Sequence, residues 1–175
     1  LYLDSKGRLS CWDMNSKSCL VIDSHTDKLI AVFNEKTIGR ENWITGDKNL
    51  LFVDQDEFWF STSKGELLII GLKDSKISTF VTDINKNPSG RKNFSTIYRD
   101  RKGNIYCGGE GFYVLPFTKK STFAFEYINL NRNGKNADDI KYPVLNIIED
   151  KQGMIWVSRV NKGIVRYNPQ TKETI

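Results

Sequence analysis

Nucleophilic hydrolysis requires a general base, and His25 is the single histidine of the chain. It stands between Ser24 and Thr26 in a polar stretch without a nucleophile motif, so we expect a surface histidine. Glycosidase chemistry requires two carboxylates at a set separation, and the tempting pair, Asp138 and Asp139, lies in a polar connection. We therefore predict no catalytic residue and no enzymatic activity for this chain.

Metal and cofactor chemistry also lacks its usual residues. No Cys-x-x-Cys motif and no cysteine–histidine cluster occurs around Cys11, Cys19 or Cys107. The glycine-rich run at 108–111 lies between two apolar segments and does not lead into a helix, as a phosphate loop would. We predict no metal and no cofactor. Cys11 and Cys19 are spaced to face each other across a hairpin, which leaves open a disulfide or two small core residues.

The polar connections carry aromatic and arginine side chains, which are residue types that sugar-binding sites use. Aromatic rings stack on sugar rings, and arginine bonds hydroxyl and acidic groups. Trp43 and Arg40 form the sharpest pair, because a tryptophan in a polar loop needs a partner; alternatively Trp43 folds back over neighbouring strands. The predicted ligand-binding residues lie in polar connections and at strand ends: Arg40, Trp43, Arg91, Arg132, Tyr142 and Arg159.

The composition indicates a folded, strand-rich chain. Its 175 residues are 39% hydrophobic and 12% aromatic, which supplies a core and favours strands. No stretch approaches the roughly 18 apolar residues of a membrane span, so we expect no membrane insertion by this segment. The net charge of +5 allows an anionic partner such as an acidic oligosaccharide. No nucleic-acid motif is recognisable, and we predict no nucleic-acid partner.

The elements that would position these residues form a repeat. An apolar run, an Asp-x-x-Gly turn and an aromatic strand recur about every 50 residues, which is the size of a four-stranded propeller blade. The clear copies begin at Asp100 and Asp150; weaker ones begin at Asp4 and Asp54. Repeated positions serve the blade rather than a ligand. They are Asp4, Gly7, Trp59, Asp100, Gly103, Tyr106, Asp150, Gly153 and Trp156.

Each copy divides into four short strands. The innermost strand is exemplified by 145–149, and looser outer strands are expected at 77–81 and 123–128. No segment holds a helical period, so no helix is predicted. We predict an all-β fold, a β-propeller segment of about four four-stranded antiparallel blades within a larger seven- or eight-bladed ring. The single segment spans 1–175, with blades near 1–34, 47–83, 93–129 and 144–175.

The repeat resembles the two-component regulator propeller repeat. The likeness is closest at 144–168, good at 94–115, and weaker at 51–70 and 1–22. It implies the periplasmic sensor region of a hybrid two-component system histidine kinase, which senses glycan breakdown products and signals through the membrane to its kinase. The expected function is therefore non-enzymatic oligosaccharide recognition. The alternatives are a propeller platform for protein–protein interaction and, less favoured, a propeller lyase or hydrolase.

A segment of a larger ring has a physical consequence. Blades pack face to face around a propeller, so four blades leave two apolar faces open. We expect these faces to contact a second copy of the chain or the remaining blades of a parent protein. Closure of the four blades on themselves is the other possibility.

Overall fold

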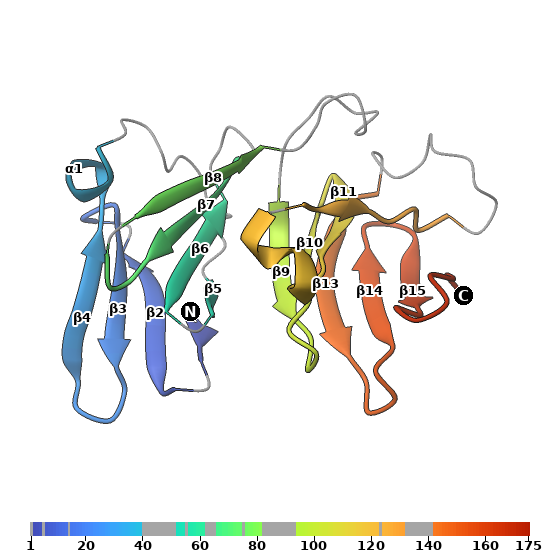
Figure 1. Cartoon of the computed structure of the whole chain (residues 1–175), viewed down its shortest axis with the longest axis horizontal. Helices are drawn as coiled ribbons and strands as arrows, with labels where there is room; N and C mark the ends of the chain where they lie inside the picture. The colour runs from blue at the N-terminus through green and yellow to red at the C-terminus, as the bar shows by residue number, and fades with distance from the viewer. Residues whose placement is uncertain are drawn as a thin grey trace. The chain divides into compact units, whose positions relative to one another are not determined.

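The computed structural model describes residues 2–4, 6–13, 15–39, 52–54, 56–61, 66–74, 76–81, 94–122, 124–131 and 142–175. The chain divides into two compact units, Leu1–Val81 and Thr82–Ile175. Each unit contains two antiparallel sheets in which sequence neighbours pair, as in a blade (Figure 1). Among the described residues, no helix is long and apolar enough to cross a membrane.

The first unit holds two four-stranded sheets. The first sheet consists of β1 (Tyr2–Leu3), β2 (Arg8–Asp13), β3 (Ser18–Asp23) and β4 (Lys28–Phe33). The second sheet consists of β5 (Phe52–Asp54), β6 (Glu57–Ser61), β7 (Glu66–Gly71) and β8 (Ile77–Val81). Strand β8 coincides with the outer strand expected at 77–81.

The second unit pairs a four-stranded sheet with a three-stranded sheet, where the repeat predicted four strands in each. The third sheet consists of β9 (Phe94–Arg99), β10 (Ile105–Gly109), β11 (Gly111–Leu115) and β12 (Glu126–Tyr127). The fourth sheet consists of β13 (Val144–Glu149), β14 (Ile155–Arg159) and β15 (Gly163–Tyr167). Thr174 bridges Tyr167, and Ile175 exchanges backbone hydrogen bonds with Arg166, so the last residues lie against the edge of β15.

Short helices occur where none was predicted. Helix α1 (Glu35–Ile38) begins with a capping box, in which the Asn34 side chain accepts from the amides of Lys36 and Thr37. The 3-10 helix η1 (Phe117–Thr122) precedes β12, which occupies only part of the strand expected at 123–128. Both helices are too short for a helical period to show in the sequence.

The Asp-x-x-Gly turns owe their shape to one carboxylate and one glycine. Asp150 Oδ1 accepts from the amides of Gln152 and Met154 at 2.9 and 3.0 Å, and the Gly153 amide donates to the Asp150 carbonyl. Gly153 has φ +81°, a left-handed conformation that glycine adopts without steric cost. Asp100 with Gly103 and Asp4 with Gly7 repeat this geometry.

Each unit has its own core between its two sheets. In the first unit, Val21 and Phe33 pack with Phe58 and Leu68 of the second sheet. The Phe33 and Phe58 rings stack with centroids 5.0 Å apart. Burial of such apolar side chains is the main force that holds two blades together.

The core of the second unit is equally aromatic. Tyr106 and Phe112 of the third sheet stack at 5.8 Å, and Phe112 meets Tyr167 of the fourth sheet edge to face at 6.2 Å. Gly108 lets the two sheets approach closely, because a Cβ built there would lie 2.4 Å from Val144. Val144 of β13 therefore packs directly on the backbone of β10.

The cysteines do not form a disulfide. Cys11 lies opposite Leu20 and Cys19 lies opposite Trp12, so the two cysteine side chains project from opposite faces of the first sheet. All three cysteines are free thiols. Burial raises the pKa of the Cys19 and Cys107 thiols, as expected for small core residues.

Candidate functional site

Two predicted ligand-binding residues, Tyr142 and Arg159, lie together at one end of the fourth sheet. Tyr142 stands just before β13, and Arg159 is the last residue of β14. The Arg159 Nε donates to the Tyr142 carbonyl at 3.2 Å, and the guanidinium carbon lies 6.0 Å from the centre of the Tyr142 ring. The other predicted positions, Arg40, Trp43, Arg91 and Arg132, lie outside the described residues.

Arg159 acts as a buried anchor for this end of the sheet. Its exposed fraction is 5%, and its Nη1 donates to Asn131 Oδ1 at 3.2 Å. It therefore ties the segment before β13 to the segment that follows β12. A buried guanidinium needs such acceptors, because an unsatisfied charge in the interior is costly. Its role here is to hold Tyr142 in place.

Lys162 is a site residue that the sequence did not reveal. It lies in the β14–β15 turn, is exposed, and places its Nζ 4.6 Å from the centre of the Tyr142 ring. The turn is fixed to the neighbouring connection because the Val160 amide donates to the Pro143 carbonyl at 3.0 Å. Nothing in the sequence indicates that Asn131, 28 residues before Arg159, accepts a hydrogen bond from its guanidinium.

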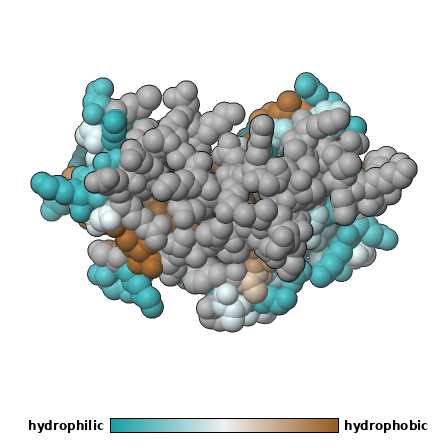
Figure 2. All heavy atoms as spheres, turned by 90° about the horizontal axis from the view of Figure 1, so that it is seen from above, coloured by the Kyte–Doolittle hydropathy of each residue, from teal (hydrophilic) through white to brown (hydrophobic). Residues whose placement is uncertain are grey.

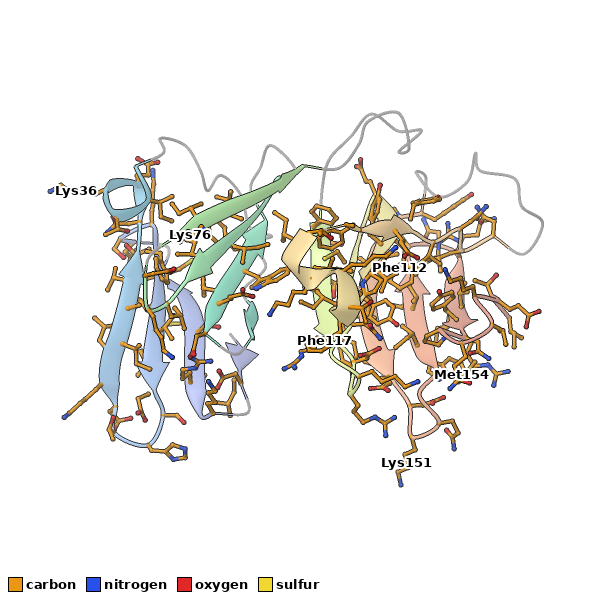
Figure 3. The ribbon with its side chains drawn as sticks, in the orientation of Figure 1. Lys36, Lys76, Phe112, Phe117, Lys151 and Met154 are labelled. Carbon is orange, nitrogen blue, oxygen red and sulfur yellow. The ribbon has the colours of Figure 1, made fainter. Side chains whose placement is uncertain are left out.

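Tyr142, Arg159, Lys162 and Asn131 define what we call the Tyr142 site. The tyrosine is half-buried, and the Lys162 ammonium lies over its ring. An aromatic surface next to a cation can accept a sugar ring and an acidic substituent. The Asp150–Gly153 turn lies at the other end of β13, and Figure 3 labels Lys151 at its tip.

The repeated aromatic residues serve the sheets. Trp59 and Tyr106 are buried, and they donate to the carboxylates of Glu57 and Asp100 respectively. Trp156 is half-buried and donates from Nε1 to Asp150 Oδ2 at 2.7 Å. This bond, with the turn amides, holds the pKa of the Asp150 carboxyl below its usual range.

Charged groups also join consecutive turns within each unit. Asp56 meets Lys73, Arg8 and Lys6 at 3.0, 3.2 and 3.3 Å. Hydrogen bonds from Lys73 and then Lys6 lower the pKa of Asp56 to about 2. In the second unit, Arg101 pairs with Glu149 at 3.1 Å, which links the turn of the third sheet to that of the fourth.

A general base or a metal site would need histidine, cysteine or carboxylate groups gathered in one place. His25 is exposed in a turn, and its amide donates to Asp23. The part of the chain that the structure describes contains no group of three histidine, cysteine or carboxylate residues able to hold a metal ion. The Tyr142 site combines an aromatic surface with positive charge, as Trp156 also does with the Arg166 guanidinium, whose carbon lies 5.7 Å from the Trp156 ring centre.

Comparisons with known proteins identify the architecture. No family model and no curated protein matches the sequence. Among solved structures, the extracellular domain of the putative one component system BT4673 from B. thetaiotaomicron matches with TM-score 0.66 and 18% identity. The match covers 99% of this chain and 21% of that chain.

Two further structures match with similar scores. The WD40 β-propeller domain of Doa1 gives TM-score 0.61 at 15% identity, over 96% of this chain and 49% of that one. The β-propeller domain of Cps50 (Swd1) from Myceliophteria thermophila gives 0.61 at 10%, over 99% of this chain and 52% of that one. This chain thus spans about a fifth to about half of the chains it matches.

These likenesses define the class of protein. The antiparallel sheets follow one another along the chain. This arrangement matches β-propeller domains over nearly the whole chain. The chain is an all-β protein built of β-propeller blades, as the repeat predicted. At such low sequence identity the match concerns the fold, and function must be argued from the site.

Proposed function

We propose that the chain is a non-enzymatic sensor-propeller segment of a hybrid two-component signalling protein. In this proposal it recognises an oligosaccharide in the periplasm and relays binding to a membrane-linked kinase. Two observations support it: the repeat at 144–168 resembles two-component regulator propellers, and the structure resembles the extracellular domain of a putative one component system.

The Tyr142 site carries the proposal. A sugar ring would stack on the exposed part of Tyr142, and a carboxylate or sulfate on that sugar would reach Lys162, whose Nζ lies 4.6 Å from the ring centre. Arg159 would keep the ring in place through its bond to the Tyr142 carbonyl. The proposed ligand is consequently an acidic oligosaccharide, which the net charge of +5 also favours.

The same geometry suggests how binding is transmitted. Tyr142 belongs to the connection before β13, whereas Lys162 belongs to the β14–β15 turn. A ligand that contacts both would favour the arrangement in which the connection and the turn are held together. A ligand shifts a conformational equilibrium only through such differential contacts. In this proposal the ligand stabilises one arrangement of this end of the blade, and that arrangement is the signal that is passed on.

A thermal-shift screen against neutral, uronic and sulfated oligosaccharides tests the proposal. We expect an increase in Tm of several degrees with one acidic class, as for a ligand well above its Kd. Tyr142→Ala and Lys162→Ala should abolish the increase. Lys151→Ala, at the opposite end of the same strands, should retain it. Absence of any shift across the panel would contradict oligosaccharide recognition by this chain.

A propeller that only binds proteins is the second candidate. The exposed apolar side chains of the first and fourth sheets favour it, since such surfaces commonly bind partners. The Tyr142→Ala variant distinguishes the two candidate functions. Tyr142→Ala would eliminate sugar binding, whereas a partner bound through the apolar sheet faces would still bind.

A further inference from the structure

Positive charge is distributed unevenly between the two units. The second unit, Thr82–Ile175, contains 16 lysine and arginine residues against 9 aspartate and glutamate residues. The first unit, Leu1–Val81, contains 10 against 12. The second unit therefore carries all of the chain's excess positive charge. Such a charge difference between two halves of a chain indicates a polyanionic partner or an anionic surface.

In the first unit, the charged groups of the Asp-x-x-Gly turns neutralise one another. Asp56 of the second sheet's turn pairs with Lys6 and Arg8 of the first sheet at 3.3 and 3.2 Å, and with Lys73 at 3.0 Å. Arg8 also pairs with Asp4 at 2.7 Å. The cations at this end of the first unit thus have carboxylate partners within the molecule.

The corresponding turns of the second unit expose two lysines without such partners. Lys102 and Lys151 are exposed, and neither pairs with a carboxylate in the part of the chain that the structure describes. The carboxylates of these turns are directed inward instead. Asp100 and Asp150 accept from the turn amides and from the aromatic residues of the following strands. The exposed tip of each turn is therefore basic.

Arg101 joins these two turns. Its amide donates to Glu149 Oε2 at 2.9 Å, and its guanidinium donates to the Asp150 carbonyl and pairs with Glu149 at 3.1 Å. The Glu149 side chain is 6% exposed, whereas that of Arg101 is 60% exposed, so the cationic member of the pair faces solvent. The two lysine-bearing tips and Arg101 consequently form one continuous surface.

An exposed phenylalanine adjoins the same turns. Phe117, the first residue of η1, is 53% exposed, and its ring lies against Gly103, where a built Cβ would be 3.0 Å from the Phe117 Cδ2. The Phe117 amide donates to Asn104 Oδ1 at 3.0 Å, which fixes the start of η1 beside the turn. Figure 3 labels Phe117 and Lys151 in the lower half of the second unit. We call Arg101, Lys102, Phe117 and Lys151 the turn surface.

A single exposed apolar side chain would not mark a site. On the face shown in Figure 2, hydrophobic residues lie at the surface among hydrophilic ones, as is usual for a folded chain. Phe117 differs in that three cations stand in the adjoining turns. A soluble polyanion needs cations alone, whereas an anionic membrane accepts cations at its phosphates and aromatic rings at the level of its headgroups. The combination favours an anionic lipid surface.

We propose that the turn surface binds the headgroups of a membrane that contains anionic phospholipid. In this contact Arg101, Lys102 and Lys151 meet lipid phosphates, and the Phe117 ring enters the headgroup layer. The contact is peripheral and involves no strand or helix that crosses the bilayer. The Asp150–Gly153 turn lies at the opposite end of β13 from Tyr142, so membrane contact and ligand binding at the Tyr142 site do not compete.

Co-sedimentation with lipid vesicles tests this proposal. Vesicles of equal parts phosphatidylglycerol and phosphatidylcholine present an anionic surface, and vesicles of phosphatidylcholine alone present a neutral one. The turn variant carries Lys102→Glu and Lys151→Glu. The matched control carries Lys17→Glu and Lys36→Glu, two exposed lysines of the first unit, so both variants have the same net charge. Circular dichroism checks that each variant is folded.

We expect the wild type to bind the anionic vesicles and not the neutral ones, with an affinity that falls as salt is raised. The turn variant should bind at least about tenfold more weakly, because each basic residue near an anionic surface contributes about fivefold. The control should stay within about threefold of the wild type. Phe117→Ser should weaken binding several-fold, since its ring no longer enters the headgroup layer.

Three results would overturn the proposal. The first is a wild type that does not bind the anionic vesicles. The second is an equal loss in the turn variant and the control, because net charge alone would then account for binding. The third is a Phe117→Ser variant that binds vesicles as the wild type does, while the turn variant loses binding to dextran sulfate. That outcome would assign the turn surface to a soluble polyanion.

Discussion

The hydrogen bonds of the Asp100 carboxylate explain why the turn begins with an acidic residue. It accepts from the amide and the side chain of Asn104 at 2.8 and 2.7 Å, and from the Tyr106 hydroxyl at 3.3 Å. Burial and the nearby Asp100 charge raise the pKa of Tyr106, so this hydroxyl remains a donor. One residue thus closes the turn and orients the aromatic ring that enters the core.

Asp100→Ala should destabilise the chain by about 1–3 kcal/mol, because buried donors lose their acceptor. Urea unfolding followed by circular dichroism measures the loss. Lys102→Ala, an exposed change in the same turn, should stay within about 0.5 kcal/mol of wild type. Equal effects of the two variants would show that the carboxylate has no special part in the turn.

The lowered pKa of Asp56 predicts that the stability of the folded chain depends on pH. Its pKa is lowered in the folded chain from 3.8 to about 2, so it favours the folded state above pH 4. That contribution falls as the pH drops from about 4 towards 2. Asp56→Asn should therefore lower the free energy of unfolding at pH 7, with the difference from wild type shrinking in this interval. Unfolding curves between pH 2 and 7 measure it.

The exposed residue Gln170, which does not titrate, supplies the control for this pH series. Gln170→Ala should give a stability difference from wild type that does not change between pH 4 and 2. A difference for Asp56→Asn that is constant over the whole range would contradict a lowered pKa at Asp56.

At the scale of the elements, Gly108 sets how closely the third and fourth sheets pack. Gly108→Ala should cost about 1–3 kcal/mol, because its Cβ would lie 2.4 Å from Val144 and 2.8 Å from Thr96. Val144→Ala removes the nearer obstacle. The double variant should therefore be less destabilised than the two single losses together, by about 0.5 kcal/mol or more. Strict additivity, measured by urea unfolding, would exclude this contact.

The sequence was informative where a pattern repeats. Fold class followed from Asp-x-x-Gly turns and short apolar runs, and strand β8 coincides with the expected 77–81. Local hydrogen bonding was harder to foresee. The capping box at Asn34 forms a single helical turn, and η1 ends just before the strand expected at 123–128, of which β12 occupies only Glu126–Tyr127. Such short elements leave no periodicity to detect.

The site was predictable only in part. Tyr142 and Arg159 were chosen for their residue types, and the structure places them in contact. Lys162 follows Arg159 in the β14–β15 turn, whereas Asn131, 28 residues before Arg159, joins the site through tertiary packing. A single sequence carries no signal of that proximity. The structure also shows that Arg159 is a buried anchor, a role that residue type alone does not distinguish from ligand contact.

At the scale of the whole molecule, the net charge of +5 predicts a salt dependence. Affinity for an acidic oligosaccharide should fall several-fold between about 10 and 300 mM salt, because screening shortens from about 30 Å to less than 10 Å. Titration calorimetry at both concentrations measures it. A neutral oligosaccharide of the same length is the control. If binding of the acidic ligand did not depend on salt, Lys162 and the surrounding positive charge would not contribute to the affinity.

We propose that the ligand binds at the Tyr142 end of the fourth sheet. A titration of the isotope-labelled chain with the oligosaccharide that stabilises it most, followed by two-dimensional amide NMR, tests it directly. We predict that perturbed amides cluster at Tyr142, Val160 and Lys162, while those of the Asp150–Gly153 turn stay unchanged. Perturbations confined to that turn, or spread evenly over both ends of the sheet, would contradict the account.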